Sequence, residues 1–248
     1  MYSGAFSSAL TLSSGLFLSV LSGAAAALPE LTPIPQQMCW TSGAECRLAV
    51  SEVRGVAADA ALPANMPAVE RLAKVLRTSL SPAPDGNLKL VLGTLPATVP
   101  DRTRGEAYAL VVDRNGATIT AETAHGVHHG LISLALLADP EEGIPCVTIT
   151  DWPGQSMRGT YVPTVEQAET RFDQFVALKL NLLLLEDNRL YDLDDPEIRA
   201  RFQRLAERCR ANYIDFVPEL QSLGWGHSVL EREPRAVEAS LVQRMAFP

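Results

Sequence analysis

Residues 146–161, CVTITDWPGQSMRGTY, divide the chain into two parts with different hydrophobic patterns. Residues 146–150 alternate β-forming side chains, and the run stops at 151–154, DWPG, where proline cannot donate to a sheet ladder and glycine permits a turn. A second extended run, with an arginine in it, covers 157–161. We therefore expect a small α+β domain before this stretch and a different architecture after it.

The part after this stretch alternates between strand and helix patterns. Residues 179–187, KLNLLLLED, contain four consecutive leucines bounded by polar residues, which is typical of a parallel strand covered on both faces. A helix with a capping box of Thr164 and Gln167 precedes it. Another helix begins at 195–196, Asp-Pro, and a strand follows at 214–220. This alternation predicts the beginning of a β/α barrel or of a doubly wound sheet.

The part before the stretch predicts strands and two helices around one small sheet. In order, we expect a strand at 49–56, a helix from an Asn65 N-cap to Leu80, strands at 88–93, 106–113 and 117–121, and a helix at about 123–137. An Arg-Asn-Gly turn predicts that the last two strands form a hairpin. Gly126 and Gly130 share one face of the second helix, and we interpret them as positions of close packing on the sheet.

Three histidines in the second helix, His125, His128 and His129, raise the question of a metal site. The carboxylate of an H-E-x-x-H zinc helix is absent, because Gly126 follows His125. No cluster of Glu or Asp follows either. We therefore predict no metal site.

Four cysteines, at 39, 46, 146 and 209, allow three disulfide connectivities. Cys39 and Cys46 are close enough in sequence to close a small loop. Cys146 begins a predicted strand and Cys209 lies on the apolar stripe of a predicted helix, so we expect both as buried free thiols. No C-x-x-C pair indicates a structural zinc site or a thioredoxin-like centre.

The net charge limits which partners the protein can bind, and the amino-terminal segment indicates its cellular compartment. The net charge of -8 and the lack of basic runs argue against nucleic acid or an anionic membrane surface as partner. Residues 5–27 are uncharged and end in an alanine run that resembles a cleavage site, so we predict a signal peptide over 1–27. The protein is then exported, periplasmic or extracellular. An uncleaved signal anchor is the alternative, although the many serines argue against a stable membrane span.

The junction also resembles a known family. D-W-P followed by R-G, placed after a G-x-x-x-G-L-x-S-L helix and before a K-x-N strand, is similar to the domain junction of family 20 glycoside hydrolases, the β-N-acetylhexosaminidases. The resemblance covers roughly 105–230 and is strongest to bacterial members. It implies a zincin-like α+β domain over 28–150, a small sheet with helices on one face. The first three or so β/α units of a TIM-type barrel would follow over 151–248. The zincin-like domain is named for its shape, and the match implies no metal and no cofactor.

In a barrel of this type, functional groups lie at the carboxyl ends of the strands. We expect Arg158, Glu186, Asp187 and Glu219 there. The resemblance gives Arg158 the role of an arginine that hydrogen-bonds sugar hydroxyls. It matches Asp187 to the acid after the second strand and Glu219 to the P-E of the third. The implied partner is a glycan or amino-sugar substrate.

One further binding residue, His227, depends on the alignment. The family has a Gly-His pair after the third strand, and LGWGH here matches it either at His227 or with Trp225 in the place of the histidine. The sequence leaves this choice open.

The expected barrel is incomplete. A barrel of this type needs about 250 residues, far more than follow the junction. The family's catalytic Asp-Glu pair lies after the fourth strand, and no Asp-Glu dipeptide occurs in this sequence. We therefore expect a fragment of a longer hydrolase, without catalytic residues, that tends to self-associate through exposed barrel edges. The alternatives are a non-catalytic carbohydrate-binding or assembly module and a fragment of an α-glucuronidase-like or α-N-acetylglucosaminidase-like hydrolase.

Overall fold

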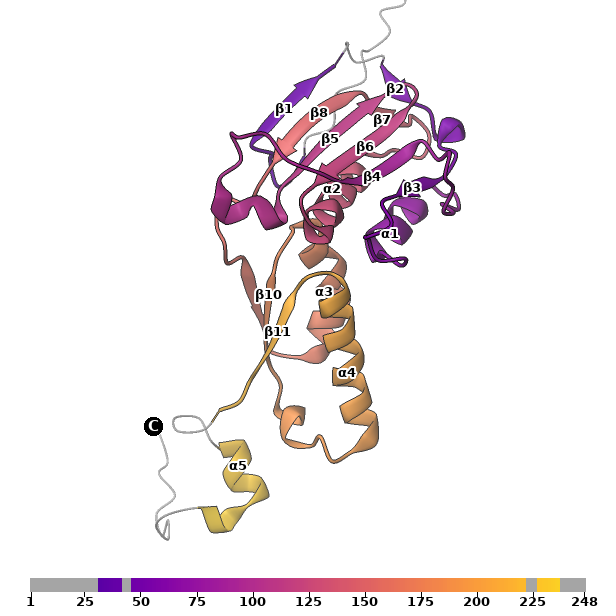
Figure 1. Ribbon diagram of the computed structural model, residues 1–248. Coiled ribbons are helices and arrows are strands. Elements are labelled where there is room, and N and C mark those ends of the chain that lie inside the picture. Colours follow the sequence, from indigo (N-terminus) through magenta and orange to yellow (C-terminus); the bar gives the residue numbers. More distant parts are fainter. Residues whose placement is uncertain (1–30, 42–45, 222–226, 237–248) are drawn as a thin grey trace, which may run out of the picture.

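The structure, a computed structural model, describes residues 31–41, 46–221 and 227–236. It has a large sheet with two helices beneath it and, further along the chain, a smaller sheet with helices beside it (Figure 1). No helix within these described ranges is long and apolar enough to cross a membrane. The predicted signal peptide lies outside the described residues.

The large sheet has six strands, in the spatial order β1-β8-β5-β6-β4-β3. They are β1 (Gln37–Trp40), β3 (Val56–Ala58), β4 (Leu88–Leu92), β5 (Tyr108–Asp113), β6 (Gly116–Ala121) and β8 (Val147–Asp151). The sheet is mixed, because β1, β8, β5 and β6 are antiparallel neighbours while β6, β4 and β3 run parallel. The helices α1 (Pro67–Val75) and α2 (Ala124–Leu137) cover one face (Figure 1). This confirms the expected α+β architecture, with a sheet larger than predicted.

Shorter elements complete the described part of the chain. They are the strand pair β2 (Arg47–Leu48) and β7 (Ile144–Pro145) and the 3-10 helices η1 (Val50–Glu52), η2 (Asp101–Glu106), η3 (Asn188–Tyr191) and η4 (Pro234–Ala236). Both η2 and β5 contact α2.

The helix α2 begins and packs as the sequence predicts. Its N-cap is Thr123, whose hydroxyl accepts a hydrogen bond from the backbone N–H of Gly126 at 3.2 Å. A Cβ atom on Gly126 would lie 2.2 Å from the carbonyl oxygen of Ala107, and one on Gly130 would lie 2.5 Å from Cγ2 of Ile119. Both glycines are therefore positions of close helix-to-sheet packing.

Two predicted boundaries in the first part are wrong. Residues 49–56 do not form one strand, because η1 occupies the middle and Gly55, with φ of +132°, interrupts the extended backbone before β3. Asn65 is not an N-cap. The helix α1 starts at Pro67 after Met66, which makes no side-chain cap bond, and proline at the first position removes one of the unpaired N–H groups.

The disulfide joins Cys46 and Cys146, whose Cα atoms are 5.3 Å apart. The expectation that Cys146 is a free thiol was therefore wrong. The antiparallel pair β2 and β7 brings the two cysteines opposite each other, and the backbone N–H of Cys146 donates to the carbonyl of Cys46 at 2.8 Å. Cys39 is exposed and free. Cys209 is buried and free, as predicted, and burial raises the pKa of its thiol to about 12.

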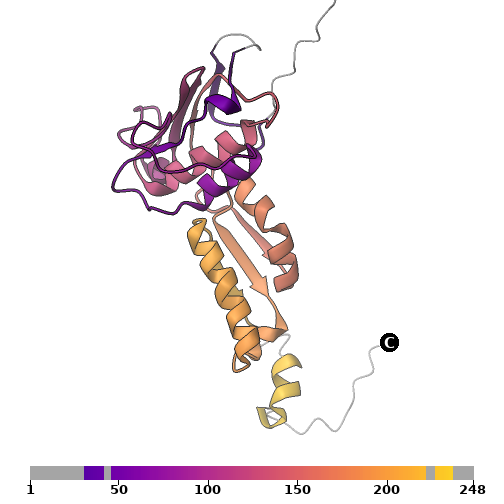
Figure 2. The same ribbon diagram turned by 90° about the vertical axis from the view of Figure 1, so that its right-hand side faces the viewer.

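The smaller sheet is parallel throughout, in the order β11-β10-β9. Its elements are β9 (Gly159–Val162), α3 (Val165–Ala177), β10 (Leu182–Glu186), α4 (Pro196–Ala211) and β11 (Asp215–Glu219), followed by α5 (His227–Arg232). The helices α3 and α4 lie on one side of it, to its right in Figure 1 and in front of it in Figure 2. Their N-caps are Thr164 and Asp195, as the sequence predicts.

One face of this sheet is buried and the other is open, so within the described residues the expectation that β10 is covered on both faces was wrong. Leu183 and Leu185 are fully buried toward the helices. On the opposite face Tyr161 is 50% exposed and Val217 is 41% exposed. Within the described residues β9 and β11 have no second neighbour, and self-association through these edges stays a prediction.

Candidate functional site

The carboxyl edge of the smaller sheet gathers two carboxylates and a phenol on its open face. Glu186 ends β10 and Glu219 ends β11, at directly paired positions. The hydroxyl of Tyr161, in β9, donates a hydrogen bond to Oε2 of Glu186, and this bond raises the pKa of Tyr161. Sequence analysis missed Tyr161, although strand alternation places it on the same face as Glu186. Such a cluster can exchange hydrogen bonds with sugar hydroxyls.

Asp187 follows Glu186 directly in the sequence, but its carboxylate is buried and accepts hydrogen bonds from other groups of this chain. Oδ2 accepts from the backbone N–H of Val165 at 2.8 Å and from Nη2 of Arg189 at 2.7 Å, and Oδ1 accepts from the backbone N–H and Nε of Arg189 at 3.0 and 2.9 Å. Burial raises the pKa of Asp187, but the Arg189 guanidinium and these backbone donors outweigh it, so the pKa is lowered. Asp187 therefore ties the end of β10 to the start of α3, and the sugar contact predicted for it has no free acceptor in this arrangement.

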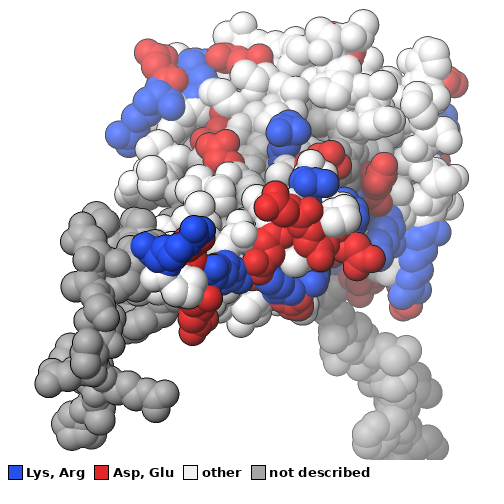
Figure 3. All heavy atoms as spheres, turned by 90° about the horizontal axis from the view of Figure 1, so that it is seen from below, with Lys and Arg blue, Asp and Glu red and all other residues white. Residues whose placement is uncertain are grey.

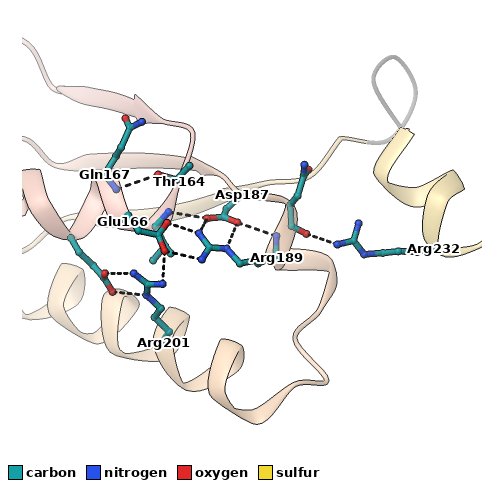
Figure 4. Close-up of polar contacts among 10 residues, drawn as sticks. Thr164, Glu166, Gln167, Asp187, Arg189, Arg201 and Arg232 are labelled. Carbon is teal, nitrogen blue, oxygen red and sulfur yellow. Dashed lines mark hydrogen bonds and ion pairs between the residues drawn. The ribbon is translucent and has the colours of Figure 1, made fainter.

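Arg189 extends this contact into a chain of ion pairs (Figure 4). It donates to both carboxylate oxygens of Glu166, at 2.8 and 2.6 Å, and lowers the pKa of Glu166 to about 2. Arg201 pairs with Glu166 and with Glu169. Acidic and basic side chains lie next to each other on this end of the molecule (Figure 3). Solvent screens such pairs, so the chain of ion pairs fixes loop geometry more than it adds stability.

Arg158 lies at the opposite end of the sheet from Glu186. We expected it at a carboxyl end, but it precedes β9 and its backbone N–H donates to Oδ1 of Asn181, just before β10. Its guanidinium donates to the carbonyls of Lys179 and Gln155, at 2.9 and 2.8 Å, and to the carboxylate of Glu106. The placement of Arg158 was therefore wrong, because β9 starts only after it, at Gly159, and a residue just before a strand lies at its amino end. Its contact with a sugar stays a prediction.

The remaining predicted residue, His227, is the first residue of α5. Trp225 lies outside the described residues, so the choice between His227 and Trp225 as the family histidine stays open. The helix α5 is attached to the sheet end by Arg232, which donates to both carboxylate oxygens of Asp192 at 2.9 and 2.7 Å. Arg232 also donates to the carbonyl oxygen of Asn188 at 3.2 Å (Figure 4).

A buried polar network joins the two sheets. Lys179, just before β10, donates to Oδ2 of Asp151 at 2.8 Å and to the hydroxyl of Tyr108 at 2.9 Å. Tyr108 donates to Asp151 at 3.0 Å, and Ser133 of α2 is 2.6 Å from the Tyr108 oxygen. All four side chains are buried. Burial lowers the pKa of Lys179 although Asp151 opposes this effect, and burial with Asp151 raises the pKa of Tyr108 well above its usual value.

The three histidines of α2 lie at the same junction. The ring of His125 stacks on Tyr213, which follows α4, with centroids 4.4 Å apart and an interplanar angle of 8°. His128 meets Tyr213 edge-on at 5.2 Å. His129 is buried, with Nδ1 3.1 Å from the carbonyl oxygen of Glu106. Burial lowers the pKa of each ring, that of His128 to about 3.

We expect the free energy of unfolding to fall as the pH drops below about 6.5. His128 has a pKa near 6.5 when unfolded and about 3 when folded, so the unfolded chain binds a proton that the folded chain excludes. The stability from neutral His128 is complete above pH 6.5 and is lost toward pH 3. Between pH 7 and pH 5 the loss from this residue is about 2 kcal/mol. Urea unfolding at several pH values measures it.

The control for this pH dependence is a pair of variants. Besides Tyr213 and His129, the groups that face His128 are His125 and Arg71, and a positive charge on either acts in the same direction as burial. The variant His128→Asn should have a shallower pH dependence, and Lys74→Gln, on the exposed face of α1, should keep the wild-type slope. Equal slopes for the wild type and His128→Asn would contradict the assignment.

The fold and the site define a class of protein. A mixed-sheet α+β domain precedes parallel strand–helix units whose carboxyl edge carries acids. Residues 28–152 match the family model of glycosyl hydrolase family 20, domain 2. The chain belongs to the family 20 glycoside hydrolases, which confirms the resemblance seen at the junction.

Solved structures share this fold at low sequence identity. The exo-β-N-acetylglucosaminidase of Vibrio harveyi in complex with N-acetylglucosamine has a TM-score of 0.66 and 16% identity, over 84% of this chain and 38% of its own. The N-acetyl-β-hexosaminidase of Streptomyces plicatus has a TM-score of 0.62 and 18% identity, over 80% and 47%. The β-N-acetylhexosaminidase of Bacteroides fragilis has a TM-score of 0.61 and 16% identity, over 83% and 47%.

This chain therefore spans less than half the length of each of these three structures. No curated protein matched it. The comparisons do not favour the α-glucuronidase-like or the non-catalytic alternative.

Proposed function

We propose that this chain is the N-terminal part of a hydrolase that removes terminal N-acetylhexosamine from glycans by substrate-assisted retaining hydrolysis. The observation that carries the proposal is the family 20 match over 28–152, followed directly by parallel strands with Glu186 and Glu219 at one carboxyl edge. The fold is shared with N-acetylglucosaminidases, one of them in complex with N-acetylglucosamine. In this proposal the smaller sheet is the opening of a β/α barrel, and its open face would line the barrel interior.

The reaction needs an aspartate next to a glutamic acid, and the carboxyl edge of the smaller sheet does not have this pair within the described residues. In substrate-assisted hydrolysis the acetamido group of the sugar attacks the anomeric carbon, while an aspartate orients this group and a neighbouring glutamic acid protonates the leaving oxygen. The sequence contains no Asp-Glu dipeptide. Glu186, Glu219 and Tyr161 would bind sugar hydroxyls, and the proton for the leaving group would come from elsewhere in a complete barrel.

We expect this chain alone to release no 4-nitrophenol from 4-nitrophenyl N-acetyl-β-D-glucosaminide above the uncatalysed rate. A barrel extended with the missing strands should be active, and Glu219→Gln and Tyr161→Phe in it should raise KM, because they remove hydroxyl contacts. Glu207→Gln, on the exposed face of α4, is the matched control and should leave KM unchanged. The extension can be sought by reading the encoding DNA beyond the codon for Pro248. If the short chain did hydrolyse this substrate and Glu186→Gln abolished the activity, the proposal that Glu186 only binds sugar hydroxyls would be refuted.

We also infer that the protein is exported. The uncharged segment 5–27 supports this, and so does the disulfide between Cys46 and Cys146, since such bonds persist mainly in oxidising compartments. Mass spectrometry of the protein recovered outside the cytoplasm should find an amino terminus at Leu28. Recovery of the protein only in the cytoplasm, with residues 1–27 attached, would contradict export.

A further inference from the structure

We propose that Glu106, His125 and His129 form a site for one divalent metal ion of the zinc type, at the junction between the two sheets. One potential ligand atom of each side chain lies within 4.8 Å of those of the other two. Two ligands of one tetrahedral zinc ion, each at about 2.0–2.1 Å, stand about 3.4 Å apart. Side-chain rotations that draw the three groups together by up to about 1.4 Å therefore bring them into coordination distance.

The backbone positions explain why this set assembles and why the sequence did not reveal it. His125 and His129 are four residues apart on α2, so they share one face of the helix. We predicted no metal because Gly126 stands where a zinc helix carries its glutamate. The structure brings a carboxylate from another element, Glu106 at the end of η2, and Nε2 of His125 lies 3.7 Å from its Oε2.

The ring nitrogens are free to act as ligands. Nε2 of His125 is buried and has no hydrogen-bond partner within the described residues, which is uncommon for a buried polar atom. Nδ1 of His129 faces the carbonyl oxygen of Glu106, which can only accept, so Nδ1 carries the proton and Nε2 of the neutral ring keeps its lone pair. A backbone carbonyl that fixes the tautomer in this way is the usual second partner of a metal-binding histidine.

The charges around the set also permit a cation. Arg158 donates to Oε2 of Glu106 and is itself held by two backbone carbonyls, so it orients this carboxylate. Its positive charge weakens metal binding, but Oε1 of Glu106 accepts no hydrogen bond among the described residues. Asp215 of β11 is close enough to raise the pKa of His125 and adds negative charge opposite α2.

The site can be reached without unfolding. His125 and Glu106 have side chains that are 22% and 18% exposed. Glu106, His129 and Arg158 are among the residues that line a cavity of about 110 Å³. An ion there contacts residues of η2 and α2, while Arg158, Tyr213 and Asp215 of the second part lie around it, so binding stabilises the junction.

The test is a zinc titration of the full chain, stripped with a chelator and dialysed, by isothermal titration calorimetry near neutral pH. We expect one equivalent of zinc to bind. The variants His125→Gln and Glu106→Gln should lose at least about tenfold in affinity. Glu207→Gln, on the exposed face of α4, is the matched control for Glu106→Gln and should bind as the wild type does. Wild-type affinity in His125→Gln, or no zinc binding by the wild-type chain, would overturn the proposal.

A second measurement does not depend on whether the variants fold. Cobalt(II) added to the wild-type chain should give the visible absorption bands of a low-symmetry site with nitrogen and oxygen ligands, and zinc should abolish them. Circular dichroism of each variant shows whether it is folded. A cobalt spectrum identical to that of the hydrated ion would mean that the cluster is a packing contact with an ion pair to Arg158.

Discussion

Replacing Lys179 with methionine should lower the free energy of unfolding by about 3–5 kcal/mol. The variant leaves the carboxylate of Asp151, which is 8% exposed, buried beside Tyr108 without its counter-charge. Removing one partner of a buried pair is costly because the other charge stays out of water. Urea unfolding followed by circular dichroism at pH 7 measures the change.

Two variants separate this effect from a general sensitivity to mutation. Lys179→Met combined with Asp151→Leu removes both charges and should recover a large part of the loss. Lys74→Met, on the exposed face of α1, should change stability by no more than about 0.5 kcal/mol. If Lys179→Met is as stable as the wild type, the network does not hold the two sheets together.

Removing the disulfide should have an effect of similar size. We expect Cys46→Ala with Cys146→Ala to lower the free energy of unfolding by about 2–5 kcal/mol. The two cysteines are 100 residues apart in sequence, so the bond restricts a long loop in the unfolded chain. Unfolding midpoints in urea, with and without a reductant, measure the difference.

The control for the disulfide is Cys39→Ala, which alters an exposed free thiol and should leave the midpoint unchanged. The reductant should affect the wild type and this control equally, and should not affect the double alanine variant. An unchanged midpoint of the wild type after complete reduction would contradict the expected contribution.

Elements with local signals could be predicted from the sequence. The hairpin is one, because Oδ1 of Asp113 accepts from the backbone N–H groups of Asn115 and Gly116, at 2.7 and 3.1 Å, and so stabilises the turn within four residues. The helix α2 is another, since its cap and its two glycines are visible in the sequence. The strand β10 followed from its leucine run and polar ends.

Features that depend on distant pairing could not be predicted. The pairing of Cys46 with Cys146 follows from the contact of β2 with β7, two strands of two residues each, which are too short to show a pattern. The boundary near Asn65 was missed because proline at the start of α1 replaced the expected side-chain cap.

The same distinction holds for the candidate site. Glu186 and Glu219 were expected at a carboxyl edge, and the parallel register places them side by side there. Arg158 was misplaced because its partners, above all Glu106, belong to the other part of the chain. Glu106 itself was missed as a partner of the histidines, because only the packing of η2 under α2 brings it to them.

The network of Lys179, Asp151, Tyr108 and Ser133 also limits how this protein can change during evolution. Each member pairs with a charge or a hydrogen-bonding group of another member. A single substitution at Lys179 or Asp151 therefore leaves a buried polar partner without its counterpart. An apolar replacement of the set is reached only through a destabilised intermediate. Exposed positions on the edge strands β9 and β11 can be substituted one at a time, whereas we expect the four residues of the network to be substituted together or to be kept.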